Sequence, residues 1–166
     1  MGTHALSEKP YELAYEASIR AIENQAATVE SLRSRAGTIL AATALVTSFF
    51  GGQALSRAEH SQLPFLSFTT AALASFIAVS LLALTILLPF TLRFSLSAAA
   101  ILRVVDATED GPAPAEVLRE VALQYESMYD SNVSQVRLLA ACFQLAIVGL
   151  AGEVGFWLTV LARGGL

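Results

Sequence analysis

The sequence predicts an all-α membrane protein with three spans and with long helices that extend into the cytoplasm. Three observations lead to this fold class, and the first two concern its composition. Of the 166 residues, 55% are hydrophobic and only 14% are charged, and the mean hydropathy is +0.60. A soluble domain carries charge on about 25% of its residues. The third observation is that the apolar residues gather in three long runs, as membrane-spanning helices require.

Three segments have the length of a transmembrane helix, which takes about 20 predominantly apolar residues. They are residues 36–55, 68–92 and 138–162. The first segment is the most polar, because Thr, Ser and Gly dilute it. We expect all three to cross the bilayer and residues 1–166 to form a single membrane domain.

The basic residues predict the orientation, since cytoplasmic loops of membrane proteins are enriched in Lys and Arg. Four basic residues precede the first predicted span, and four lie between the second and the third. Only Arg57 lies between the first two spans, and only Arg163 follows the last. We therefore expect a cytoplasmic N-terminus and an external C-terminus in a bacterial inner (plasma) membrane.

Two stripes of apolar residues predict helices on the cytoplasmic side, at residues 8–35 and within the segment 93–137, which also contains a linker at 107–116. The spacing of three and four residues is that of one helix face. Each helix should continue into the next span, and residues 93–105 should prolong the second span. The two stripes either pack on each other within one subunit or also join subunits as a coiled coil. They consist of Tyr15, Ile19, Ile22, Ala26 and Val29, and of Leu118, Val121, Tyr125 and Met128.

Glu153 lies inside the third predicted span, where an ionised side chain facing lipid costs about 2.5–3.5 kcal/mol. We expect it to face protein or water. It either hydrogen-bonds hydroxyl groups of neighbouring spans, or lines a cation path as a ring from several subunits, or relays protons or pairs with Arg163. Gln144 is a second polar group, about two and a half turns away and so on another face. The candidate hydroxyl groups at matching depth are Thr47, Ser48, Ser75 and Ser80.

Small residues around Glu153 predict close packing of helices, because they let two backbones approach each other. Ala151 and Gly155 form a small-xxx-small pair, and two glycines flank the acid. Phe156 and Trp157 are expected at the outer membrane interface, as members of an aromatic belt. The residues expected to pack the helices are Gly149, Ala151, Gly152 and Gly155.

Motifs for enzymatic chemistry are missing from the sequence. It contains no Gly-rich phosphate loop, no H-E-x-x-H, no C-x-x-C and no G-x-S-x-G. The single cysteine, Cys142, excludes an intrachain disulfide. The net charge of −4 gives no basis for nucleic-acid binding. We therefore expect no enzyme, no metal site and no cofactor.

The run ENQAATVESLRSRAGTILAATALVTSFFGGQAL, residues 23–55, resembles small actinobacterial membrane proteins of unassigned function. The order of a cytoplasmic helix, a span, a short loop, a second span and a further helix, together with LRSRAGT at residues 32–38, is similar to the SLATT group. That resemblance covers residues 11–137 and implies a small transmembrane effector of nucleotide-signalled antiphage systems, proposed to form pores or to disrupt the membrane. This chain adds a third span with Glu153, and the resemblance transfers no residue role.

The leading functional hypothesis is a homo-oligomeric, pore-forming or channel-like membrane effector, in which Glu153 lies near the conduction path. The alternative is a non-conducting membrane scaffold or subunit. It would dock a cytoplasmic protein on residues 12–35 and 118–135. The expected partners are the lipid bilayer, further copies of the chain and a cytoplasmic protein.

Overall fold

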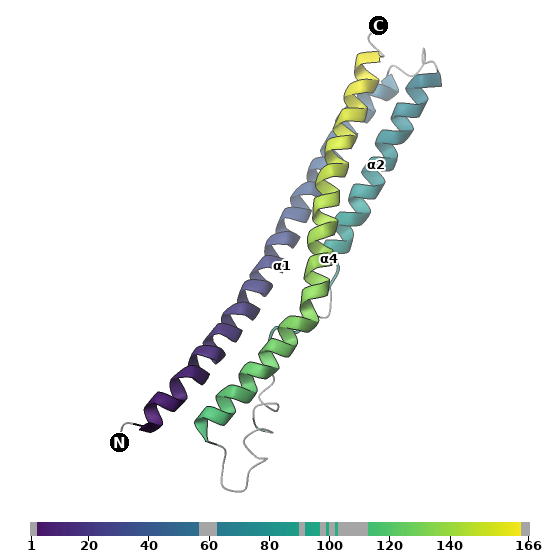
Figure 1. The fold of residues 1–166 in the computed structure, drawn as a ribbon. Coiled ribbons are helices and arrows are strands. Elements are labelled where there is room, and N and C mark those ends of the chain that lie inside the picture. Colours follow the sequence, from purple (N-terminus) through teal and green to yellow (C-terminus); the bar gives the residue numbers. More distant parts are fainter. Residues whose placement is uncertain are drawn as a thin grey trace. The chain divides into compact units, whose positions relative to one another are not determined.

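The computed structural model describes residues 3–56, 63–89, 92–96, 99, 102 and 113–163 of the chain. They form the helices α1 (Thr3–Ser56), α2 (Leu63–Leu87) and α4 (Pro114–Arg163) (Figure 1). No strand occurs among these described residues. The predicted all-α fold class is therefore confirmed.

The chain divides into two compact units, and α1 and α4 contribute to both. Unit 1 comprises Met1–Glu30 and Phe90–Arg137, and unit 2 comprises Ser31–Pro89 and Leu138–Leu166. The units differ in chemistry. Between residues 36 and 56, within α2, and from 138 to 162, Glu153 is the sole Asp, Glu, Lys or Arg. The charged residues of the helices are thus concentrated in unit 1 and at the ends of unit 2.

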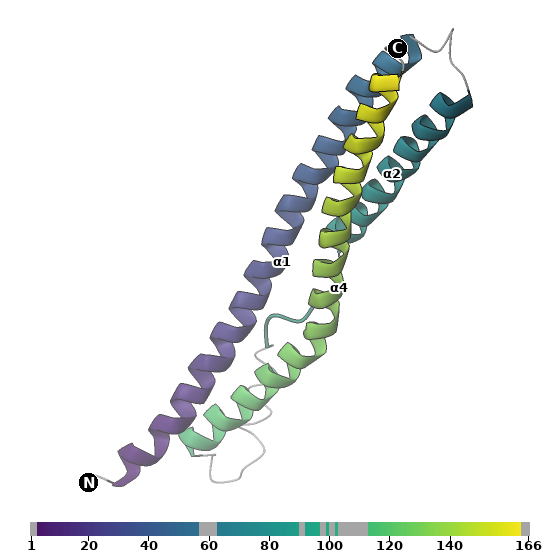
Figure 2. The ribbon, with the colours of Figure 1, turned by 45° about the horizontal axis from the view of Figure 1, so that its top comes forward.

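Unit 2 is a bundle of three helices that lie side by side in both views (Figure 1 and Figure 2). Ile39 of α1, Val79 of α2 and Ala146 of α4 form one buried cluster. A second cluster contains Ala72 of α2 and Trp157 and Val160 of α4. Residue numbers rise together along α1 and α4 and fall along α2. Within this unit α1 and α4 are therefore parallel, and α2 is antiparallel to both.

Two helical segments, Ser67–Leu87 and Pro114–Ala162, are long and apolar enough to cross a membrane. Only 22% of the residues in the apolar stretch of each are buried within the chain, whereas the core helix of a soluble protein is mostly buried. The described residues thus yield two such helices rather than three. The segment 36–55 is not among them. Its Thr, Ser, Gly and Gln residues make it the most polar of the three predicted spans.

The boundaries of the helices differ from the predicted ones. Helix α1 begins at Thr3 instead of residue 8 and contains Pro10, and α2 covers Leu63–Leu87 instead of 68–92. The predicted continuation of the second span through residues 93–105 is wrong at its start, because residues 92–96 have no helical structure. Pro89 explains the early end, since proline lacks an N–H and disfavours helical geometry at the preceding residue. Residues 57–62 of the predicted external loop and 107–112 of the linker lie outside the described residues.

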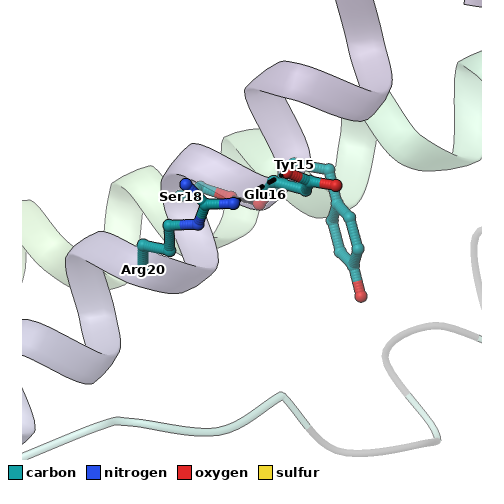
Figure 3. Close-up of polar contacts among 4 residues, drawn as sticks. All are labelled: Tyr15, Glu16, Ser18 and Arg20. Atoms are coloured by element: carbon teal, nitrogen blue, oxygen red, sulfur yellow. Dashed lines mark hydrogen bonds and ion pairs between the residues drawn. The ribbon is translucent and has the colours of Figure 1, made fainter. Parts of the chain in front are cut away.

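Unit 1 pairs the first half of α1 with the first half of α4. Ile22, Val29 and Val121 are buried, whereas Tyr15, Ile19, Leu118, Tyr125 and Met128 are half-buried. The rings of Tyr15 and Tyr125 are 6.4 Å apart. On α1, Arg20 forms an exposed ion pair with Glu16, and the Tyr15 ring projects away from that pair (Figure 3). The two predicted stripes therefore pack on each other within one chain.

Candidate functional site

Glu153 is fully buried in unit 2, and two threonines of α1 hold its carboxyl group. Thr43 donates its hydroxyl hydrogen to Oε2. Thr47 donates to Oε1, with 2.5 Å between the two oxygens. Both carboxyl oxygens thus have a donor, which offsets part of the cost of removing the group from water.

The sequence of α1 places both hydroxyl groups on the face that packs against α4. Thr43 and Thr47 are four residues apart, so they lie one turn apart on one helix face. A helical threonine commonly donates to the carbonyl oxygen four residues earlier, and Thr28 and Thr38 do so here. Thr43 and Thr47 donate to Glu153 instead. This pair is therefore committed to the contact between α1 and α4.

The surroundings of Glu153 supply hydroxyl groups and no described counter-ion. Among the residues described for unit 2, no Lys or Arg side chain forms an ion pair with it. The Arg163 side chain lies outside the described residues, so the predicted pairing with Arg163 stays a prediction. Three alternatives were open for Glu153: hydrogen bonds to hydroxyl groups, a ring along a cation path, or a proton relay or pairing with Arg163. The observed geometry corresponds to hydrogen bonds with hydroxyl groups of a neighbouring helix.

Ser75 supports the site indirectly. Its hydroxyl donates to the carbonyl oxygen of Gly149 at 2.9 Å. In an α-helix that same carbonyl accepts the N–H of the residue four positions later, which here is Glu153. Ser75 therefore fixes α2 to the turn of α4 that carries the acid, without a hydrogen bond to the acid itself.

The other polar residues predicted within the spans do not join Glu153. Ser48 and Gln144 are exposed. The Ser80 hydroxyl is buried and has no hydrogen-bond partner among the described residues. Of the four candidate hydroxyls, only Thr47 binds Glu153 among the hydrogen bonds that the structure describes.

The small residues of α4 divide between two faces. Gly149 faces α2 so closely that an added Cβ would lie 2.6 Å from Cγ2 of Val79. Gly152 is half-buried, whereas Ala151 and Gly155 are exposed. The predicted small-xxx-small pair thus does not pack the helices within one chain. An added Cβ at Gly155 would meet nothing within 4 Å.

The Trp157 side chain faces the interior of the bundle, whereas a belt residue would face outward. It is 1% exposed and packs with Ala72 and Val160. Its ring lies against the backbone of α1, 3.7 Å from a Cβ built at Gly51. The indole N–H is buried without a hydrogen-bond partner among the described residues. Trp157 faces the bundle because it follows the buried Glu153 by one helical turn.

Thr43 was missed by the sequence interpretation, although a signal for it exists. Ile22, Val29, Ala36 and Thr43 follow each other at intervals of seven residues, and all four are buried. An interval of seven keeps a residue on one side of a helix that packs in a coiled-coil manner. Extending the register of Ile22 and Val29 would have reached Thr43.

Metal-binding residues do not cluster in the described parts of the chain. No group of three or more His, Cys, Asp or Glu side chains could hold an ion there. Cys142 is buried with a free thiol. The described site offers hydrogen bonds only, from Thr43 and Thr47 to one carboxyl group.

Among the described residues of unit 1, α1 and α4 line two of the grooves on its surface. The larger has a volume of about 610 Å³, and its lining includes Gln25, Asp130 and Arg137. The Gln25 side chain donates to the carbonyl oxygen of Tyr129 at 3.3 Å. The smaller groove, of about 520 Å³, is lined in part by Tyr11, Leu123 and Glu126. Both are lined mostly by residues of the two segments predicted to dock a cytoplasmic protein.

Comparisons with known proteins give no relative: no family model, no curated protein and no solved structure matches this chain. The resemblance to the SLATT group therefore stays a prediction.

Proposed function

We propose that the chain is an integral membrane protein with three spans, the first formed by residues 36–55. This segment contains no charged residue, and its 20 residues would extend about 30 Å as a helix. Val46 and Phe50 pack against the Trp157 cluster, so this part of α1 is integral to unit 2. Leu45 and Phe49 are 71% and 65% exposed, which suits a lipid-facing surface.

The orientation and location proposed are a cytoplasmic N-terminus and an external C-terminus in a bacterial inner membrane. The distribution of Lys and Arg supports this proposal. Unit 1 would then lie on the cytoplasmic side. Its grooves and its charged residues would be accessible to soluble proteins there.

The function that the geometry favours is that of a non-conducting membrane scaffold, which presents unit 1 to a cytoplasmic protein partner. The observation that carries this choice is the pairing of Glu153 with Thr43 and Thr47 of its own chain. A carboxyl group that is fully buried and hydrogen-bonded at both oxygens links α1 to α4 within one chain. It does not present an anionic ring to a shared path. We propose no enzymatic activity.

The second candidate is the oligomeric pore-forming effector of antiphage defence that the resemblance to the SLATT group implies. The observation that favours it is the outward face of α4. There Gln144 and the small residues Ala151 and Gly155 are exposed, as expected of a surface that contacts other copies. A pore of this kind would be lined by residues other than Glu153.

Ion flux through liposomes tests the choice. The wild-type chain, an E153Q variant and empty liposomes would be compared for K⁺ and Cl⁻ release. The scaffold function predicts no flux above that of empty liposomes in either protein sample. Flux in the wild type that E153Q abolishes would overturn it in favour of a path lined by Glu153. Flux that E153Q leaves unchanged would favour a pore between copies.

A further inference from the structure

Both α2 and α4 expose large aliphatic side chains in unit 2. On α2 these include Leu73, Ile77, Leu81 and Leu84, which are 42–60% exposed, and on α4 they include Leu145, Val148 and Leu158, which are 54–68% exposed. Such side chains match lipid tails. On α4 the face opposite Glu153 has Gln144, Ala151 and Gly155 at its centre, all of them exposed. Their spacing of seven and four residues places them on one stripe.

The side-chain amide of Gln144 has no partner among the described residues of its own chain. It is exposed, and no hydrogen bond joins it to any of them. In the proposed function, on which this inference rests, residues 138–162 cross the bilayer. Lipid tails offer no donor or acceptor, and an unpaired amide in hydrocarbon costs several kcal/mol. The exposed amide is therefore a contact group for another polar side chain.

A second copy of the chain supplies such a group by symmetry. The side-chain amide of Gln144 carries N–H donors as well as an acceptor oxygen. Two such amides related by a two-fold axis can each donate to the oxygen of the other. Because all copies share one orientation in the membrane, the two α4 helices would be parallel and Gln144 would face its own equivalent.

Gly155 gives an independent reason for close contact on the same stripe. Gly149 is required by its own chain, because Val79 occupies the space of a side chain there. At Gly155 an added Cβ would meet nothing within 4 Å. Glycine costs roughly 0.5–1 kcal/mol relative to alanine inside a helix. Packing within the chain thus gives no reason for a glycine at position 155. The close approach of a second helix backbone gives such a reason.

We propose that the face of α4 formed by Gln144, Ala151 and Gly155 binds the same face of α4 in a second copy. The contact is a parallel, two-fold symmetric pairing of helices within the bilayer. The amides of Gln144 specify the register, and the small residues allow the backbones to approach.

Disulfide crosslinking in membranes tests the proposal. In a C142A background, the single-cysteine variants A151C and G155C are compared with L145C. Leu145 is 59% exposed and lies about 100° around the helix from Gln144. Oxidation should give covalent dimers with A151C or G155C and not with L145C. Absence of dimers from both A151C and G155C, or equal crosslinking by L145C, would overturn the proposal.

The same membranes separate this inference from the proposed function. Protein that an alkaline carbonate wash removes is not integral, and then the three-span proposal fails. Protein that stays in the membrane without crosslinking at residues 151 and 155 contradicts the paired α4 helices alone.

Dilution in lipid gives a second measurement, with energy transfer between labelled copies as the readout. Q144L should raise the dissociation constant of the dimer about ninefold, because it removes both symmetric hydrogen bonds and one interhelical hydrogen bond in membranes contributes about threefold on average. G155L should raise it at least tenfold, since it separates the backbones. L145A serves as the control and should leave it unchanged. Unchanged dissociation in both Q144L and G155L would overturn the proposal.

Discussion

Thr43 and Glu153, separated by 110 positions in the sequence, meet inside unit 2 through a hydrogen bond from the hydroxyl to Oε2 of the carboxyl group. Both side chains are fully buried. The bond joins α1 to α4, one turn from the second bond, which Thr47 makes. Glu153 is the only acid among the described residues of unit 2, and this pairing gives it hydrogen-bond partners within its own chain. The pairing also makes residues 36–55 part of the same bundle as the two more apolar helices.

Replacement of Thr43 by Val should destabilise the bundle by about 1–3 kcal/mol, because Glu153 then keeps a buried oxygen without a donor. Valine has the shape of threonine, so the loss reports the hydroxyl. Equilibrium unfolding in mixed detergent micelles measures the change. T38V is the matched control, since Thr38 is exposed and bonds within its own helix. A loss in T43V no larger than that in T38V would contradict the role given to Thr43.

Replacement of Gly149 by Ala should also destabilise the chain, by roughly 1–3 kcal/mol, because the new methyl group overlaps Cγ2 of Val79. Shortening the neighbour in the double variant G149A/V79A should recover part of this loss. G37A is the control, because nothing lies within 4 Å of a Cβ at Gly37. Thermal unfolding with a tryptophan readout compares the variants. Equal melting temperatures of G149A and G37A would rule out the close contact between α2 and α4.

Replacement of Asn132 by Ala should release the segment at residues 92–96. The side-chain amide of Asn132 makes two hydrogen bonds to the backbone of Arg93. Its oxygen accepts from the N–H of Arg93, and its nitrogen donates to the carbonyl oxygen of Arg93 at 2.8 Å. Loss of about 1–1.5 kcal/mol from these bonds should speed hydrogen exchange at the Arg93 amide about tenfold. S131A, which removes an exposed hydroxyl on the next residue, should leave that rate unchanged. Unaltered exchange in N132A would show that other contacts hold the segment.

Trp157 should be shielded from lipid, and as the single tryptophan it can be observed alone. In nanodiscs containing lipids with brominated acyl chains, its fluorescence should be quenched weakly, because its ring is 1% exposed. The variant W157F/L158W moves the indole to a position that is 54% exposed and should be quenched several times more strongly. Strong quenching of wild-type Trp157 would return it to the lipid-facing surface.

The helical class and the pairing of the two stripes could be predicted, because the spacing of apolar residues defines a helix face. Ile22, Val29 and Val121 lie on the predicted stripes and are buried. The position of a residue along a helix could also be predicted by counting residues. That position does not define the direction in which the side chain points, however. Ser48 is the neighbour of Thr47 in α1, yet Ser48 is exposed and Thr47 binds Glu153.

The direction of the side chains also explains the errors on α4. Ala151, Gly152 and Gly155 are all small, and their types alone gave no reason to separate them. The structure turns Ala151 and Gly155 outward, because Glu153 and Trp157 occupy the inward positions. The end of α2 at Leu87 was likewise missed, since hydrophobicity continues beyond Pro89 while helical geometry does not.

The number of spans is the central claim, and it fixes the relative location of the two chain ends. An odd number of spans separates them, and an even number does not. In a C142A background, E12C and G165C would be treated in intact spheroplasts with a membrane-impermeant maleimide, before and after permeabilisation. Three spans predict immediate labelling of G165C and labelling of E12C only after permeabilisation. Labelling of both variants under the same condition would mean that residues 36–55 do not cross the membrane, and would contradict the account.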